Sequence, residues 1–267
     1  MRSIALALAL VIGTTAAWAD ERITDDTPYK TPEGYVRAGL WKLQYGVHRV
    51  PKLEIGTYLL PYASWAFSVR TVNAQAKYQF FDHDRWTLAA TLGVAYVDLS
   101  KLDVDAQMLI VPLQFVAARR LGDRLSVGFG MMFSSISGDG GYNEDETTVF
   151  RGAVAVSNAQ SWLSLMMRVS RGWTLYLEAR AISSTEAAAE GDVMHQIDDR
   201  TRVDVNLTGN ASIDEMQGAS GLLSFQWSRQ RFRMRVGIGY GNYNLPLLNF
   251  VIPKATPFPE LDLFWVF

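Results

Sequence analysis

The residues best suited to acid–base chemistry are few. The chain contains three histidines, His48, His83 and His195, and no cysteine. Without cysteine, thiolate metal sites and cysteine nucleophiles are excluded. His195 lies in an acidic stretch, near Asp198, and a histidine next to carboxylates could serve a hydrolase. No G-x-S-x-G motif is present, and His48 and His83 lie in short turns where a solvated imidazole is the ordinary explanation. We therefore expect no catalytic residues.

A second candidate is a Gly-rich acidic stretch that includes Asp139 and Asp145. Carboxylate oxygens are the ligands that Ca²⁺ prefers. The spacing departs from that of an EF-hand, and acidic loop tips are usually solvated, so this loop is only a weak metal candidate. We expect no bound metal and no cofactor.

Charged residues recur at spacings of two, which is informative about the elements that carry them. Arg233 and Arg235 are two apart, as are Glu178 and Arg180. Two residues with this spacing share one face of a strand, whereas a helix separates them widely in angle. Apolar residues such as Phe232 occupy the positions between and beside them. The pattern favours strands with a charged face and an apolar face.

Strict alternation is clearest between residues 85 and 97. Trp86, Leu88 and Val94 belong to an apolar face with aromatic residues at both ends, and Thr87, Thr91 and other small residues form the opposite face. This is typical of a strand that faces lipid on one side and a lumen on the other. The eleven segments that we predict as strands are 36–47, 53–60, 68–80, 85–97, 106–118, 124–136, 160–170, 173–182, 219–229, 232–243 and 258–267.

The segments are joined alternately by tight turns and by long connections. The predicted turns are 47–51, 81–84, 120–123, 170–172 and 229–231, and the predicted long loops are 99–105, 137–158, 183–218 and 242–257. Short periplasmic turns and long extracellular loops alternate in this way in outer-membrane barrels. Eleven strands have the wrong parity for such a barrel, so either one of these segments does not cross the membrane or a further strand is hidden near residues 29–32 or 150–156. We expect a single all-β, antiparallel, up-and-down transmembrane barrel of 10–12 strands, with twelve slightly preferred.

The N-terminus predicts export. Arg2 precedes an uninterrupted apolar run, residues 4–12, and Ala17-Trp18-Ala19 supplies small residues at the two positions that a signal peptidase reads. We expect residues 1–19 to be a cleaved secretory signal peptide, residues 20–34 to be a periplasmic segment or an extra strand, and residues 35–267 to form the barrel. The net charge of −2 among 267 residues provides no field that would favour nucleic acid.

The C-terminus adds a resemblance. Leu261, Leu263, Trp265 and Phe267 alternate along the last strand, and the chain ends on phenylalanine. This pattern resembles the terminal β-signal of outer-membrane proteins of Gram-negative bacteria, which the barrel-assembly machinery recognises. A weaker likeness extends from Tyr45-Gly46 through residues 54–57 to residues 73–78, which resemble the opening of uncharacterised outer-membrane barrel families. The resemblance implies a location in the cell outer membrane, in contact with lipid and lipopolysaccharide.

The alternation directs a set of charges into the lumen. They are Lys77, Arg168, Glu178, Arg180, Arg233, Arg235 and Asp262. Charges inside a narrow barrel need partners, so they form either a plug-like network or a weakly basic constriction that favours anions. We expect a small channel or solute-binding barrel, porin-like and without enzymatic activity, for a small solute or an ion. The alternatives are a structural or surface-interaction barrel with a plugged lumen and an embedded lipid- or peptide-modifying enzyme.

Overall fold

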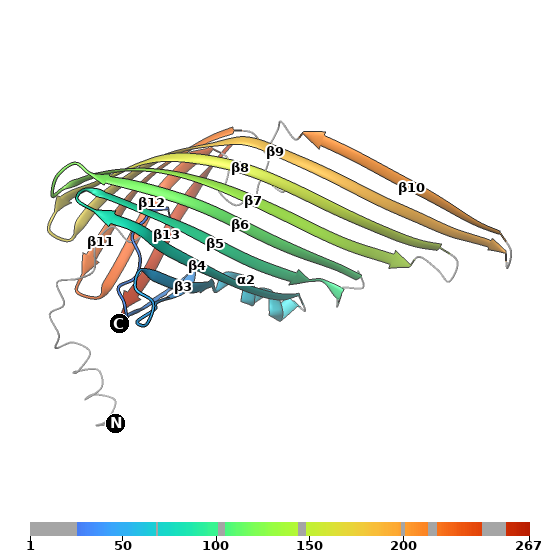
Figure 1. Ribbon diagram of the computed structural model, residues 1–267, viewed down its shortest axis with the longest axis horizontal. Coiled ribbons are helices and arrows are strands. Elements are labelled where there is room, and N and C mark those ends of the chain that lie inside the picture. The colour runs from blue at the N-terminus through green and yellow to red at the C-terminus, as the bar shows by residue number, and fades with distance from the viewer. Residues whose placement is uncertain are drawn as a thin grey trace, which may run out of the picture.

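The computed structural model describes residues 26–67, 69–100, 105–143, 148–198, 201–212, 218–241 and 255–267 (Figure 1). Within these ranges thirteen strands form one antiparallel sheet. The strands are β1 (Val36–Gly39), β2 (Lys42–Gly46), β3 (Leu53–Tyr58), β4 (Arg70–His83), β5 (Trp86–Asp98), β6 (Asp105–Arg120), β7 (Leu125–Asn143), β8 (Thr148–Ser170), β9 (Trp173–Asp198), β10 (Thr201–Ser212), β11 (Gly218–Arg229), β12 (Phe232–Gly241) and β13 (Thr256–Val266). Two helical turns, α2 (Leu60–Ala63) and η1 (Ser64–Phe67), connect β3 to β4.

The sheet closes on itself. β1 pairs with β13 at one seam, and β8 pairs with β9 along their length, so that twelve strands form a ring. β10 lies outside the ring and pairs with β9 alone. The closed, antiparallel, all-β barrel confirms the predicted fold class. In the described ranges neither helix is long and apolar enough to cross a membrane.

The twelfth barrel strand comes from a stretch predicted as a single strand. Residues 36–47 form two strands, β1 and β2, with Leu40 and Trp41 between them. The single strand was wrong because these two connecting residues are large and apolar, although Leu40 is 46% exposed and Trp41 39% exposed. An apolar turn does not interrupt an alternating pattern, whereas a Gly or Asn turn would.

The outward face of the barrel is apolar. On β5, Leu92 and Val94 point outward, whereas Thr87 and Ala89 are buried on the inner side. The same alternation places Phe129 and Phe133 of β7 outside. In a closed barrel the backbone N–H and C=O groups of every strand can form hydrogen bonds with neighbouring strands. This is the condition that strands must meet to cross the hydrocarbon core of a membrane. The apolar face is therefore the lipid-facing belt.

Two predicted extracellular loops are largely strand. Residues 137–158 belong mostly to β7 and β8, and residues 183–218 to β9 and β10. About 9–11 residues of a strand suffice to cross a membrane, whereas β9 has 26. The remainder extends beyond the belt, as the long arm of β7, β8, β9 and β10 in Figure 1 shows. The loops were predicted wrongly because outside the membrane the outward face needs no apolar residues: on β7 it continues as Ser135, Ser137 and Asp139.

Candidate functional site

The charged residues predicted for the lumen lie on the inner faces of their strands with one variation. Lys77, Glu178, Arg180 and Arg233 are buried, each at 6% exposure or less. The side chains of Arg235 and Asp262 are 11% and 13% exposed. Arg168 is exposed instead and lines a small recess with Ser126 and Thr174 at the turn end of β8.

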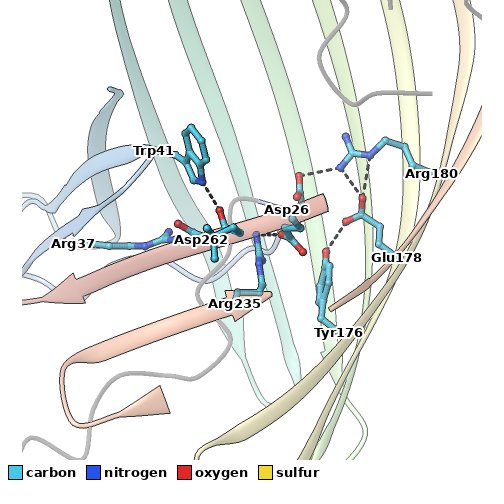
Figure 2. A network of polar contacts seen from close by, with 10 residues as sticks. Asp26, Arg37, Trp41, Tyr176, Glu178, Arg180, Arg235 and Asp262 are labelled. Carbon is cyan, nitrogen blue, oxygen red and sulfur yellow. Dashed lines mark hydrogen bonds and ion pairs between the residues drawn. The ribbon is translucent and has the colours of Figure 1, made fainter. Parts of the chain in front are cut away.

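Glu178 and Arg180 of β9 form the centre of one polar network (Figure 2). The Arg180 guanidinium donates to Glu178 Oε1 from Nε at 3.1 Å and from Nη2 at 2.9 Å. Tyr176, two residues earlier, donates its hydroxyl to Glu178 Oε2 at 2.5 Å. Arg180 Nη1 donates to Gln160 Oε1 of β8 at 3.2 Å. Each charge in this network has a charged or polar partner, as burial requires.

A second network crosses the seam between the first and last strands. Arg37 of β1 pairs with Asp262 of β13 at 3.0 Å and donates to Gln44 Oε1 at 2.8 Å. Gln44 in turn donates a hydrogen bond from Nε2 to Glu54 Oε1 of β3 at 2.8 Å. On the neighbouring strand, Arg235 forms an ion pair with Glu260. Of these contacts, the Arg37–Asp262 ion pair joins β1 to β13, the two strands at which the barrel closes (Figure 2).

Residues 26–34, which we call the N-terminal segment, lie among these inward side chains. Asp26 forms an ion pair with Arg180, with 3.1 Å between Oδ1 and Nη2, and its main-chain carbonyl accepts a hydrogen bond from Trp162 Nε1 at 3.2 Å. Lys77 Nζ donates to the carbonyl of Tyr29 at 2.9 Å. The main-chain N–H of Thr31 donates to Glu54 Oε2 at 2.5 Å.

Residues 27–29 and 31 of the segment are as deeply buried as the barrel's own interior, whereas Glu33 and Gly34 are exposed. Thr27 is 1% exposed, Tyr29 5% and Thr31 0%. The Tyr29 ring packs with Ala118, Met166 and Tyr176, which come from β6, β8 and β9. The Tyr29 hydroxyl lies 3.4 Å from Ser126 Oγ of β7. The segment therefore contacts wall strands from several sides of the lumen at once.

Sequence reasoning predicted a periplasmic segment or an extra strand for residues 20–34. The described part, from residue 26, forms turns and bends with an isolated parallel bridge between Glu33 and Gly46. No local signal marks its position, because its partners lie far along the chain: 154 residues separate Asp26 from Arg180. The inward residues Arg37, Gln44 and Glu54 were also missed, although the alternation of their strands would have identified them.

Cations outnumber acids among the lumen residues named in this section and their neighbour Lys42. The cations are Arg37, Lys42, Lys77, Arg180, Arg233 and Arg235, and the acids of the wall are Glu54, Glu178, Glu260 and Asp262. The N-terminal segment adds the acids Asp26 and Glu33 and the cation Lys30, which together carry a net charge of −1. The wall alone is thus weakly basic, and the segment lowers this excess.

The remaining candidates lie elsewhere. His83 is exposed, 3.5 Å from Asp84 in a turn, and His48 lies in the turn before β3. The side chains of His195 and Asp145 lie outside the described residues, and Asp139 is exposed on the outward face of β7. Among the residues described, no group of three His, Asp or Glu side chains is placed to hold a metal ion.

In the predicted assembly signal, Leu261, Leu263 and Trp265 alternate along β13, where Leu263 is half-buried, and Phe267 directly follows the strand. Leu261, Trp265 and Phe267 are 44%, 44% and 48% exposed, while the intervening Phe264 and Val266 are buried. The main chain of Phe267 exchanges two hydrogen bonds with Val36, with distances of 2.8 and 3.1 Å. The last residue therefore helps to close the seam.

Several solved structures align with most of this chain. A mutant of the TodX monoaromatic hydrocarbon channel aligns over 88% of this chain and 67% of its own, with 12% identity and a TM-score of 0.47. The translocator domain of the autotransporter NalP from Neisseria meningitidis aligns over 86% and 85%, with 10% identity and a TM-score of 0.33. The toluene transporter TodX of Pseudomonas putida aligns over 87% and 86%, with 7% identity and a TM-score of 0.36.

No family model matches the sequence, and neither does any curated protein. The classification follows from the molecule itself, because a closed antiparallel ring with an apolar outer belt and a polar interior is the architecture of outer-membrane proteins. The chain is an integral β-barrel of the outer membrane.

Proposed function

We propose that the protein is a small-solute channel of the outer membrane and that the N-terminal segment closes its passage in this conformation. The observation that carries the proposal is the position of residues 26–31, which lie among inward side chains of β3, β4, β7, β8 and β9. A polypeptide held there blocks the axial route for solutes.

The character of the wall supports transport of solutes, with a preference for anions. Buried charges are costly, and a barrel that serves only as an anchor could fill its interior with apolar side chains instead. Here the wall retains an excess of cations, and a ring of one charge sign is a common basis of ion selectivity. The segment adds an acid and main-chain donors and acceptors, which match these wall groups while the passage is closed.

The second candidate is a structural barrel with a permanently plugged lumen. The ion pairs Arg37–Asp262 and Arg235–Glu260 favour it, because they join neighbouring strands of the wall and could serve stability alone. Both candidates share the closed state and differ in whether a passage exists once the segment is released.

Planar-bilayer conductance of the purified barrel tests the proposal. The release variant carries Asp26→Ala, Tyr29→Ala and Thr31→Gly, which remove an ion pair, a packed ring and a fully buried side chain without changing any residue of the wall. The matched control replaces the exposed β10 residues Asn206, Leu207 and Thr208 by alanine. We expect low conductance from the original chain and the control and steady, anion-preferring conductance from the release variant. If the release variant folds and remains silent, the structural barrel is the better account.

We also infer how the protein reaches its place. Residues 1–19 direct export and are removed, and the barrel-assembly machinery reads the alternating residues at the end of β13. Lipid and lipopolysaccharide then cover the apolar belt. These steps follow from the sequence pattern and from the outward placement of Leu261, Trp265 and Phe267.

A further inference from the structure

One contact of the N-terminal segment has the form of ligand recognition. Asp26 presents a carboxylate to Arg180 Nη2 at 3.1 Å and a carbonyl to Trp162 Nε1 at 3.2 Å. A guanidinium N–H that donates to a carboxylate is a typical contact of an oxyanion site, and the Trp162 N–H holds the main chain of the same residue beside it. In Figure 2, Asp26 lies opposite the end of the Arg180 side chain, and Arg180 comes from the wall.

Arg180 is held in place by residues of the wall. Its side chain is 4% exposed. Glu178 accepts from Nε and Nη2, Gln160 accepts from Nη1, and the guanidinium carbon lies 4.3 Å from the centre of the Trp162 ring. These contacts fix the plane of the guanidinium, so the direction in which Nη2 meets Asp26 is set by β8 and β9. A preorganised donor loses little entropy when it binds an anion.

The acid that fills the site belongs to a segment outside the sheet. Asp26 precedes β1 by ten residues and takes no part in any strand, and its side chain is 27% exposed. The site and its occupant are therefore separable: the wall can keep its geometry while another carboxylate replaces that of Asp26.

We propose that Arg180, held in place by Glu178, Gln160 and the Trp162 ring, is a binding site for the carboxylate of an anionic solute, and that Asp26 occupies this site as an intramolecular stand-in. The proposal deepens the channel function and rests on it, since it names the solute class. A solute carboxylate competes with Asp26 for Arg180. Because Asp26 is part of the N-terminal segment, its replacement removes one of the contacts that hold the segment in the lumen.

Chemical rescue with acetate tests the site without any measurement of conductance. Asp26→Gly removes the whole side chain and leaves a space for one acetate ion next to Arg180. We expect acetate, at constant ionic strength with chloride as the replaced anion, to raise the apparent Tm of the Asp26→Gly barrel by about 2–4 °C. The original chain, whose site is filled, should show no such rise.

The double variant Asp26→Gly, Arg180→Gln is the matched control, because it has the same space and lacks the guanidinium. An acetate effect in the single variant that disappears in the double variant supports the site. An equal effect in both, or none in either, overturns it, and an equal effect of inorganic phosphate overturns the carboxylate preference. Should Asp26→Gly yield no folded barrel, Asp26→Ala with formate makes the same test.

The two proposals fail separately. If acetate rescues Asp26→Gly while the release variant stays silent in a bilayer, the carboxylate site exists in a barrel that conducts nothing, and its role in transport is overturned. If the release variant conducts and acetate has no specific effect, the channel stands and the carboxylate site does not.

Discussion

At Gly46 of β2 the main chain of the N-terminal segment leaves no room for a side chain on the wall. A Cβ atom on Gly46 would lie 2.0 Å from the carbonyl oxygen of Pro32 and 2.6 Å from that of Thr31. Both obstacles are main-chain atoms, which cannot rotate away as a side chain does. In Gly46→Ala the segment must therefore move until the contact reaches at least the ordinary 3.4 Å.

The size of the effect follows from the contacts that such a movement breaks. Gly34 N donates to Gly46 O at 2.7 Å, and Gly46 N donates to Tyr35 O at 3.0 Å. Each is worth about 0.5–1.5 kcal/mol, and the bond from Thr31 N to the Glu54 carboxylate about 1.5–3 kcal/mol. Losing most of this set costs about 2–5 kcal/mol, which lowers the Tm of a barrel of this size by roughly 5–15 °C.

Two measurements check this prediction. The first is the Tm of the purified barrel, read from heat-modifiable gel migration. The second is the rate at which a maleimide labels Thr31→Cys, a clean reporter because the chain has no other cysteine and Thr31 is 0% exposed. Labelling should be slow with Gly46 and faster with Gly46→Ala. Gly209→Ala is the control, since a Cβ there meets nothing within 4 Å. An unchanged Tm together with blocked labelling in Gly46→Ala would refute the placement of the segment against β2.

Three further predictions concern the barrel itself. Deleting Phe267 removes two main-chain hydrogen bonds at the seam and the last residue of the proposed assembly signal, so the folded protein in outer-membrane fractions should fall, and an undiminished yield would argue against the signal. A protease site inserted next to Asn206 should be cut on intact cells, and one at Gly122 only after the membrane is opened; cleavage at Gly122 on whole cells would invert the assigned orientation. Arg235→Glu places a carboxylate against Glu260 and should cost about 3–5 kcal/mol of stability, because it leaves buried like charges together. Adding Glu260→Arg should recover part of that loss, and no recovery would mean that the two side chains are not paired.

Local alternation determined the parts of this protein that depend on one strand at a time. Between residues 85 and 97 the period of two distinguished lipid-facing Leu92 from inward Ala89, and the structure has the same division. The reason is physical: a strand that crosses a membrane must present apolar side chains to lipid at every second position. The sequence of such a strand therefore shows directly which residues face lipid. The closed barrel fold was predictable on this ground.

Outside the membrane, where outward-facing residues need not be apolar, the alternation of apolar residues no longer identified strands. Beyond the belt, β9 and β10 are strands with water-compatible residues on their outward face, and the sequence alone indicated loops. At the β1–β2 connection the error was the opposite one, because the apolar Leu40 and Trp41 concealed a turn. Strands outside the membrane can be polar, and this turn is apolar. The alternation of apolar residues alone therefore could not locate the ends of these strands.

The interior of the lumen was decided by the tertiary structure. The sequence alone predicted which charges point inward, but the partners of those charges depend on the register between strands and on the course of residues 26–34. Tyr29 meets Ser126 across 97 residues of chain, and Asp26 meets Arg180 across 154. No periodicity encodes such contacts, because they exist only once the ring has closed around the segment and made two distant stretches neighbours.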